Sequence, residues 1–147
     1  MSQKSKILVI EDDVDLVAAI SKMLEMKGYE VISAYDPEEG WDKLNALKPE
    51  LIILDVMFGG RGEAKGFDFA QKLKLEKKYA DIPVLMLTAI NTQKPYFNFS
   101  PETDAEFLPV DSFLEKPIQS EELFIKVEEL LKQKVSKWIN WPEKKNK

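Results

Sequence analysis

The 147-residue chain contains neither cysteine nor histidine. Without cysteine it cannot form disulfide bonds, carry out thiol chemistry or bind a metal through thiolates. Without histidine it lacks the commonest general base and the usual ligand of transition metals, and it cannot hold a phosphohistidine of its own. A metal site in this chain must therefore use oxygen ligands, which suit a hard cation such as Mg²⁺.

The chain also lacks a concentrated basic surface and a long apolar run. Its formal net charge is −5, its isoelectric point is about 4.9, and its lysines are scattered apart from a short basic stretch at residues 144–147. Phosphate contacts need clustered positive charge, so we expect no direct binding of nucleic acid. The first apolar run, residues 7–10, is too short for a signal peptide or a membrane span, and we expect a cytoplasmic protein without membrane contact.

Length and composition favour a single folded domain. A chain of 147 residues has ordinary domain size, and its 44% of hydrophobic residues is enough to build a core. The sequence shows no internal repeat, linker or second domain. We expect one domain over residues 1–147, with its core at about residues 5–135 and a short extension at residues 136–147.

Five apolar runs that are typical of strands alternate with segments of helical spacing. The expected strands are residues 7–10, 29–34, 51–54, 82–88 and 112–114, and the expected helices are residues 14–27, 37–48, 67–79 and 120–138. Residues 91–109 contain three prolines, and no full helix is expected there. This alternation predicts an α/β fold with a flavodoxin-like five-stranded parallel sheet of order 2-1-3-4-5 and helices on both faces.

Each expected helix has an apolar side that should face the sheet. The second helix has a strong start signal, because Asp36 can cap it, Pro37 suits its first position and Glu39 its third. The apolar sides comprise Val17, Ile20 and Leu24; Trp41, Leu44 and Leu47; Phe69 or Ala70, Leu73 and Lys77; and Leu123, Val127, Leu130, Leu131, Val135 and Trp138.

Polar residues follow the carboxyl ends of four expected strands. They are Glu11, Asp12 and Asp13 after the first strand, Asp55 at the end of the third, Thr88 at the end of the fourth and Lys116 after the fifth. In a parallel sheet these ends share one edge, and the order 2-1-3-4-5 makes the first and third strands neighbours beside a crevice. Crowded carboxylates repel one another unless a cation joins them, which indicates Mg²⁺.

A threonine hydroxyl and a lysine ammonium at the same edge complete a pocket for a tetrahedral anion, since one donates a hydrogen bond and the other supplies a charge. The chemistry that suits this set is phosphoryl transfer onto Asp55. Each residue also has an ordinary structural explanation. Acids after the first strand can cap the next helix, Thr88 can simply end a strand, and Lys116 can be a solvated surface lysine.

The four segments that carry these residues resemble the receiver domain of two-component response regulators. The segments are Ile7-Leu8-Val9-Ile10-Glu11-Asp12, Leu51-Ile52-Ile53-Leu54-Asp55-Val56-Met57, Leu85-Met86-Leu87-Thr88-Ala89 and Phe113-Leu114-Glu115-Lys116-Pro117. The resemblance covers about residues 5–135. Any one segment is a weak signal, but four in this order, each at the end of a strand, are a strong one.

The resemblance implies a role for each matching residue. Asp55 matches the phosphoacceptor, and Glu11 and Asp12 match the acidic pair that holds Mg²⁺. Asp13 matches a flanking acid that is common in the family. Met57 would offer its backbone carbonyl to the metal.

The resemblance extends to the residues that respond to the phosphoryl group. Thr88 matches the switch hydroxyl and Lys116 the phosphate-binding lysine. Phe113 matches the position of the family's switch aromatic residue, which usually rotates inward on activation. A permanent place in the core explains this residue equally well. The peptide bond between Lys116 and Pro117 matches one that is cis in the family.

Three segments depart from the family's pattern. Residues 59–66 form a longer loop with four glycines, which is either a tolerated surface loop or a gate that brings Arg61 or Lys65 to the anion. Residues 91–109 carry prolines and aromatics where the fourth helix of the family belongs, so the usual output surface and switching through Phe113 are in question. The last helix continues to Trp138 and Trp141, which can pack back on the domain or meet a second copy to form a homodimer.

We therefore expect a stand-alone receiver that accepts a phosphoryl group on Asp55 from a sensor histidine kinase or a histidine phosphotransfer protein. It would signal to a downstream protein target through protein–protein contacts and would not be an enzyme. The alternative is an interaction module of the same fold that works independently of phosphorylation. A phosphatase that forms a phosphoaspartate is less favoured, because Met57 stands where such hydrolases usually place a second acid.

Overall fold

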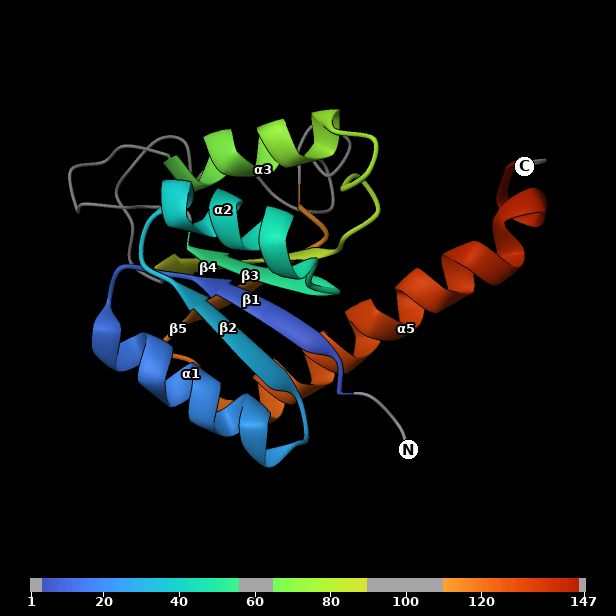
Figure 1. Ribbon diagram of the computed structural model, residues 1–147. Coiled ribbons are helices and arrows are strands. Elements are labelled where there is room, and N and C mark those ends of the chain that lie inside the picture. Colours follow the sequence, from blue (N-terminus) through green and yellow to red (C-terminus); the bar gives the residue numbers. More distant parts are fainter. Residues whose placement is uncertain (1–3, 56–64, 90–109, 146–147) are drawn as a thin grey trace.

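The computed structural model describes residues 4–55, 65–89 and 110–145, and it describes their side chains except those of residues 65, 67, 89 and 133–145. The described strands and helices are, in order, β1 (Lys6–Ile10), α1 (Val14–Met26), β2 (Glu30–Ala34), α2 (Pro37–Leu47), β3 (Leu51–Asp55), α3 (Lys65–Leu75), β4 (Val84–Ala89), β5 (Ser112–Lys116) and α5 (Ser120–Lys145). Strands and helices alternate from β1 to β4, and β5 and α5 are the last two described elements (Figure 1).

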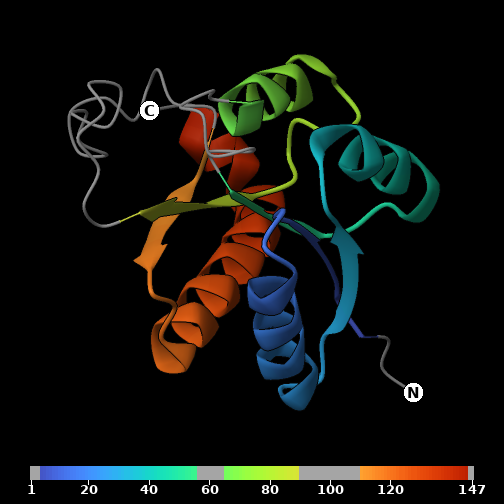
Figure 2. The ribbon, with the colours of Figure 1, turned by 90° about the vertical axis from the view of Figure 1, so that its left-hand side faces the viewer.

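The five strands form one parallel sheet of order β2-β1-β3-β4-β5, which confirms the predicted α/β architecture. Helices α2 and α3 cover one face of the sheet, and α1 and α5 lie side by side on the other (Figures 1 and 2). Strand β3 lies in the centre between β1 and β4. The last residue of β3, Asp55, pairs in register with Leu87, and the last residue of β1, Ile10, pairs with Leu54.

Two cores form because successive residues of a strand point to opposite faces of the sheet. In β3, Ile52 and Leu54 belong to the core beneath α2 and α3, whereas Leu51 and Ile53 belong to the core beneath α1 and α5. All five residues of this strand are buried. The continuous apolar run that ends in Asp55 is therefore explained by a strand covered on both faces, and this cover fixes where the aspartate lies.

Helix α2 begins as its sequence predicts. The Asp36 side chain accepts a hydrogen bond from the backbone N–H of Glu39 at 2.8 Å, and the Glu39 side chain accepts one from the N–H of Tyr35 at 2.8 Å. The predicted apolar side is partly wrong, because Leu47 is 41% exposed and Gly40 is buried instead. A Cβ atom on Gly40 would lie only 2.6 Å from Ile10 Cδ1, so the glycine allows the helix to approach β1 closely.

Helix α3 differs from its predicted bounds at both ends. It begins at Lys65, inside the segment expected to be a loop, and it ends at Leu75 rather than at Tyr79. The chain then turns, and the side chain of Tyr79 enters the core at 5% exposure while Lys77 stays exposed. A tyrosine buries far more apolar surface than a lysine, which explains why the turn replaces the expected last helical turn.

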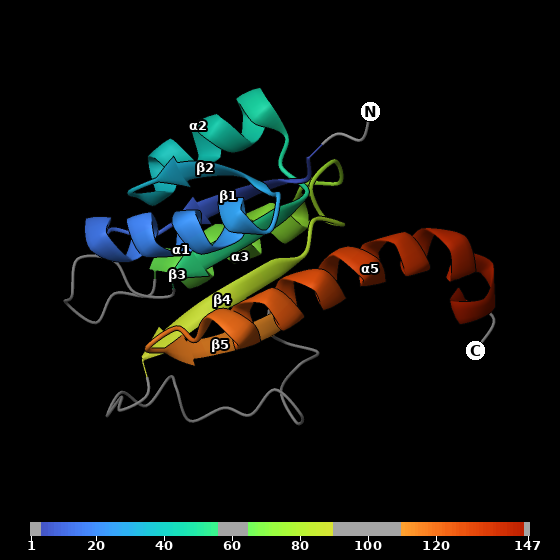
Figure 3. The same cartoon turned by 90° about the horizontal axis from the view of Figure 1, so that it is seen from below.

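Helix α5 packs its predicted apolar side against the sheet through Leu123, Val127 and Leu130. Val135 and Trp138, expected on the same side, lie outside the described side chains, and residues 59–64 and 91–109 lie outside the described residues altogether. Beyond the sheet, α5 continues as a projecting helix (Figures 1 and 3). Within the described part of the chain, no helix is long and apolar enough to cross a membrane.

Candidate functional site

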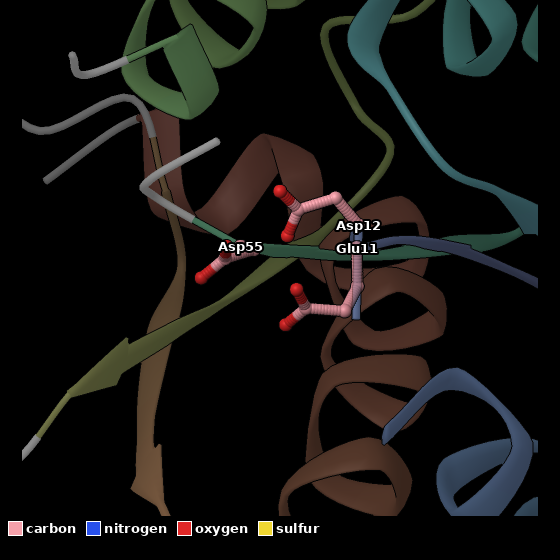
Figure 4. A group of neighbouring side chains, drawn as sticks. All are labelled: Glu11, Asp12 and Asp55. Atoms are coloured by element: carbon pink, nitrogen blue, oxygen red, sulfur yellow. The ribbon is translucent and has the colours of Figure 1, made fainter. Parts of the chain in front are cut away.

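Three carboxylates converge where β1 and β3 end. Glu11 and Asp12 directly follow β1, and Asp55 is the last residue of the neighbouring strand β3. Each of the three residues offers a carboxylate oxygen, and these oxygens all lie within 4.8 Å of one another (Figure 4). The parallel sheet thus brings together acids that are more than forty residues apart in the sequence.

The cluster ranges from fully buried to solvent-exposed. Glu11 is 0% exposed and Asp55 5% exposed, whereas Asp12 is exposed. The backbone N–H of Glu11 donates to the Ala34 carbonyl at 3.0 Å, and its side-chain Oε2 accepts from the N–H of Asp13 at 3.1 Å. These bonds fix Glu11 at the floor of the site, and the exposure of Asp12 leaves the site open on its side.

Asp13 caps helix α1, a role that the sequence allowed equally for Glu11 and Asp12. Its side chain accepts a hydrogen bond from the backbone N–H of Leu16 at 3.2 Å and caps α1. Glu11 and Asp12 are therefore not needed as the cap of α1. Helix capping explains Asp13 but not the two acids before it.

Lys116 supplies the positive charge of the site. Its Nζ lies 2.9 Å from Glu11 Oε1 and 3.2 Å from Asp55 Oδ1, so one ammonium joins the buried acids of two strands. The side chain comes from the end of β5, and the peptide bond between Lys116 and Pro117 is cis, as the resemblance implied. The pattern of strand ends predicted that Lys116 would reach this edge, but it did not predict the closer pairing with Glu11.

The electrostatics of the site depend on burial. The pKa of Glu11 is raised to about 7, chiefly by burial and also by the nearby charge of Asp55, while the Lys116 ammonium opposes both effects. For Lys116 burial lowers the pKa, but hydrogen bonding and charge from Glu11 and Asp55 outweigh it, so its pKa is raised. Lys116 therefore stays charged at neutral pH, whereas Glu11 is poised between its two forms.

The donor set fits Mg²⁺. It consists of carboxylate oxygens, which are the ligands that a hard divalent cation prefers, and one lysine does not neutralise three acids. Burial and the charge of Asp55 raise the pKa of Glu11 and so disfavour its ionised form, and a divalent cation would favour that form. Glu11, Asp12 and Asp55 are the described residues that could hold the ion. Met57, whose carbonyl the resemblance added to this set, lies outside the described residues.

Two further residues that the sequence singled out, Thr88 and Phe113, lie on β4 and β5. Thr88 lies on β4, one residue beyond the partner of Asp55, so the register places it at the same edge, and it is partly buried. Phe113 is partly buried on β5, pairs in register with Met86 and packs against the core beneath α2 and α3. Of the proposed gate, Arg61 and the side chain of Lys65 lie outside what the structure describes.

Fold and site together define a receiver domain, and comparison with known proteins gives the same result. The model of the response regulator receiver domain matches residues 7–128. The chain therefore belongs to this family, as its sequence resemblance predicted. Receiver domains are signalling modules that accept a phosphoryl group, bind Mg²⁺ at an acidic pocket and interact with histidine kinases and phosphotransfer proteins.

Among curated proteins, the chain is similar to DNA-binding response regulators. It is 35% identical over 127 residues to the DNA-binding dual master transcriptional regulator RpaA of Synechocystis, with 86% of this chain and 49% of that protein covered. It is 34% identical to the alkaline phosphatase synthesis transcriptional regulatory protein PhoP of Bacillus subtilis, with 86% and 48% covered. The chain thus spans about half the length of the curated relatives it matches.

Solved structures show the same fold. The chemotaxis protein CheY4 of Vibrio cholerae has a TM-score of 0.72 at 25% identity, with 87% of this chain and 99% of that chain covered. The N-terminal domain of a response regulator receiver protein from Methanoculleus marisnigri has a TM-score of 0.62 at 34% identity, with 84% and 94% covered. The second comparison includes almost all of that N-terminal domain.

Proposed function

We propose that Asp55 is the phosphoacceptor of this receiver domain and that a sensor histidine kinase or a histidine phosphotransfer protein is its donor. The observation that carries the proposal is the convergence of Glu11, Asp12 and Asp55 at the carboxyl edge of the sheet, where Lys116 pairs with Glu11 and Asp55. The chain has no histidine, so the phosphohistidine must come from another protein. The chain's role is to receive the group and to change its contacts.

The transfer requires a carboxylate nucleophile and compensation of charge. An Asp55 oxygen attacks phosphorus, the new O–P bond forms while the P–N bond of the phosphohistidine breaks, and the electron pair leaves on the imidazole nitrogen, which takes up a proton. Asp55 is 5% exposed and held at the end of a buried strand, so its position is fixed before the donor arrives. Lys116 Nζ, 3.2 Å from Asp55 Oδ1, is within reach of a phosphoryl oxygen on the same side chain.

Glu11, Asp12 and Asp55 would hold the Mg²⁺, together with the backbone carbonyl of Met57. The ion supplies positive charge that offsets the charge of the transferring phosphoryl group. The protein's own contribution is to hold Glu11 rigidly through two backbone groups while Asp12 stays open to the solvent. This arrangement provides a fixed floor and an accessible entrance.

Phosphorylation would change the charge of the site by about −1.5 to −2 near pH 7. Thr88, at the same edge on β4, would donate a hydrogen bond to the phosphoryl group, and Phe113 on the adjacent β5 would respond to the movement of β4. We propose that this change alters a protein-binding surface, and that the chain acts as a single receiver domain, with its core at about residues 5–135, on a cytoplasmic protein target.

The test is the mass of the intact protein after incubation with a small-molecule phosphodonor, such as acetyl phosphate, and Mg²⁺. The wild type should gain one phosphoryl group, Asp55→Asn should gain none, and a chelator should suppress the gain. Asp81→Asn, which removes an exposed acid far from the site in the sequence, serves as the matched control and should be phosphorylated like the wild type.

The same variant separates this proposal from a phosphorylation-independent interaction module. A donor kinase or target that binds phosphorylated wild type and Asp55→Asn with equal affinity would favour the module. Multiple turnover on a phosphomonoester would instead revive the phosphatase alternative.

A further inference from the structure

An acidic cleft with an aromatic floor lies between α2 and α3. Its volume is about 380 Å³, and it is lined by Pro37, Glu38, Trp41, Asp42, Asp68, Phe69 and Lys72. Glu38, Asp42 and Asp68 are exposed on its rim, so three carboxylates face one ammonium. None of these residues belongs to the phosphoryl site. The cleft is large enough for an aromatic side chain and has the charge to attract a basic one.

The floor of the cleft consists of aromatic rings packed against one another, and one ring face is in contact with a cation. The Trp41 ring meets the rings of Phe69 and Tyr79 edge to face, with centroids 5.6 and 5.9 Å apart. Lys72 Nζ lies over the Trp41 ring, 4.6 Å from its centroid. Attraction between a ring face and a cation is favourable, and Lys72 shows that this face is accessible to an ammonium group. A lysine from outside could take the same position.

The extension, residues 136–147, has the complementary composition. Its sequence contains Trp138, Ile139 and Trp141 together with four lysines and one glutamate, a net charge of +3. The remaining 135 residues carry a net charge of −8. The extension is therefore a basic aromatic segment attached to an acidic domain, and the domain's own charge disfavours approach to other anionic surfaces.

The extension cannot reach the cleft of its own chain as a continuous helix. Helix α5 and the cleft lie on opposite faces of the sheet, and α5 runs out beyond the sheet, away from the ends of α2 and α3 where the cleft is (Figures 1 and 3). The helix continues to Lys145, so ten residues of the extension reach on the order of 15 Å further at the usual helical rise. A second copy, by contrast, can offer its cleft to this segment.

We propose that the extension of one chain docks in the acidic cleft of a second copy and that the exchange is reciprocal. A two-fold symmetric pair would then contain two identical contacts, each combining aromatic residues of the extension with Trp41 and its lysines with Glu38 and Asp42. None of the residues that line the cleft belongs to the phosphoryl site, so the contact needs no phosphoryl group.

Sedimentation velocity of the full 147-residue chain over a range of concentrations tests the docking. The wild type should form a dimer, and a variant that ends at Val135 should remain monomeric. The double variant Glu38→Lys/Asp42→Lys should weaken dimerisation at least tenfold. Glu25→Lys/Glu129→Lys makes the same charge change on exposed positions of α1 and α5 and should dimerise like the wild type.

A charge swap makes the test specific. Combining Glu38→Lys/Asp42→Lys with Lys144→Glu/Lys145→Glu should restore the dimer, because attraction returns with its signs exchanged. A wild type that stays monomeric, or a dimer that the cleft substitutions leave unchanged, would overturn the proposal. Flotation of monomeric wild type with phosphatidylserine vesicles would overturn it in favour of a membrane surface. Asp55→Asn should dimerise like the wild type. The docking proposal and the assignment of Asp55 as phosphoacceptor can therefore fail independently of each other.

Discussion

Replacing Glu11 by glutamine should stabilise the metal-free protein, and the gain should depend on pH. Glu11 is fully buried, and its pKa is raised from 4.5 to about 7 by burial and by the charge of Asp55, against the opposing effect of Lys116. Each pKa unit corresponds to about 1.4 kcal/mol. The ionised carboxylate therefore costs the folded state about 3 kcal/mol relative to the protonated form.

The direction follows from proton binding. Because the pKa of Glu11 is higher in the folded state, the folded protein binds more protons than the unfolded chain between about pH 4.5 and pH 7. The contribution of Glu11 to stability is fully present below pH 4.5, falls as the pH rises through this window and is flat above it. Glutamine does not titrate, so the stability difference between variant and wild type should grow by about 2 to 3 kcal/mol from pH 4.5 to pH 8.

Urea unfolding in the presence of a chelator at several pH values measures this difference. Glu25→Gln removes an exposed acid of α1 and serves as the control, for which the difference should stay constant within about 0.5 kcal/mol. A Glu11→Gln effect that does not change with pH would refute the view that Glu11 carries an under-compensated buried charge. Saturating Mg²⁺ should then stabilise the wild type more than the variant, since the ion would offset the same charge.

Other consequences of the structure can be tested in the same way. Gly40→Val should destabilise the domain by about 1–3 kcal/mol in urea unfolding, because even its Cβ would lie 2.6 Å from the buried Ile10 Cδ1; a loss below 0.5 kcal/mol would contradict this close approach. Lys74→Met should cost about 1–2 kcal/mol, because Lys74 donates to two backbone carbonyls in the turn before β4, whereas Lys77→Met at an exposed position should be neutral; equal effects would contradict it. A tenfold excess of Mg²⁺ over its dissociation constant should raise the free energy of unfolding of the wild type by about 1.4 kcal/mol, and Asp12→Asn should lose most of that gain. Equal Mg²⁺ effects on the two proteins would place the metal elsewhere.

The backbone arrangement and the convergence of the acids were predictable because they depend on periodicity and chain direction. The buried run of β3 ends in Asp55, the run of β1 is followed by Glu11 and Asp12, and parallel strands must bring these ends to one edge. The cap of α2 by Asp36 was predictable for a similar reason, since it needs only residues adjacent in the sequence.

Features that depend on three-dimensional packing, such as which side chains of α2 and α3 are buried, were not predictable. Leu47 has the right spacing but is 41% exposed, because the buried side of α2 is formed by Gly40 and Leu44, and Gly40 lies against Ile10. Tyr79 displaces the expected last turn of α3 by entering the core. The pairing of Lys116 with Glu11 at 2.9 Å depends on side-chain geometry across three strands, which no sequence spacing contains.

The acidic cleft between α2 and α3 has the same origin. Trp41 was expected to face the core, and it does pack there, but no sequence pattern indicated that Asp68 and Lys72 of α3 would lie around it. The basic aromatic composition of residues 136–147 is evident in the sequence, but the placement of α5 and the cleft on opposite faces of the sheet is not.

The most direct test of the central claim is to locate the acyl phosphate on the chain. The protein is treated with acetyl phosphate and Mg²⁺, the acyl phosphate is reduced with borohydride, which converts the modified aspartate to homoserine, and the peptides are sequenced by mass spectrometry. The proposed function predicts homoserine at position 55 and at no other acid. Modification at Asp12 or at another acid, with Asp55 unmodified, would contradict it.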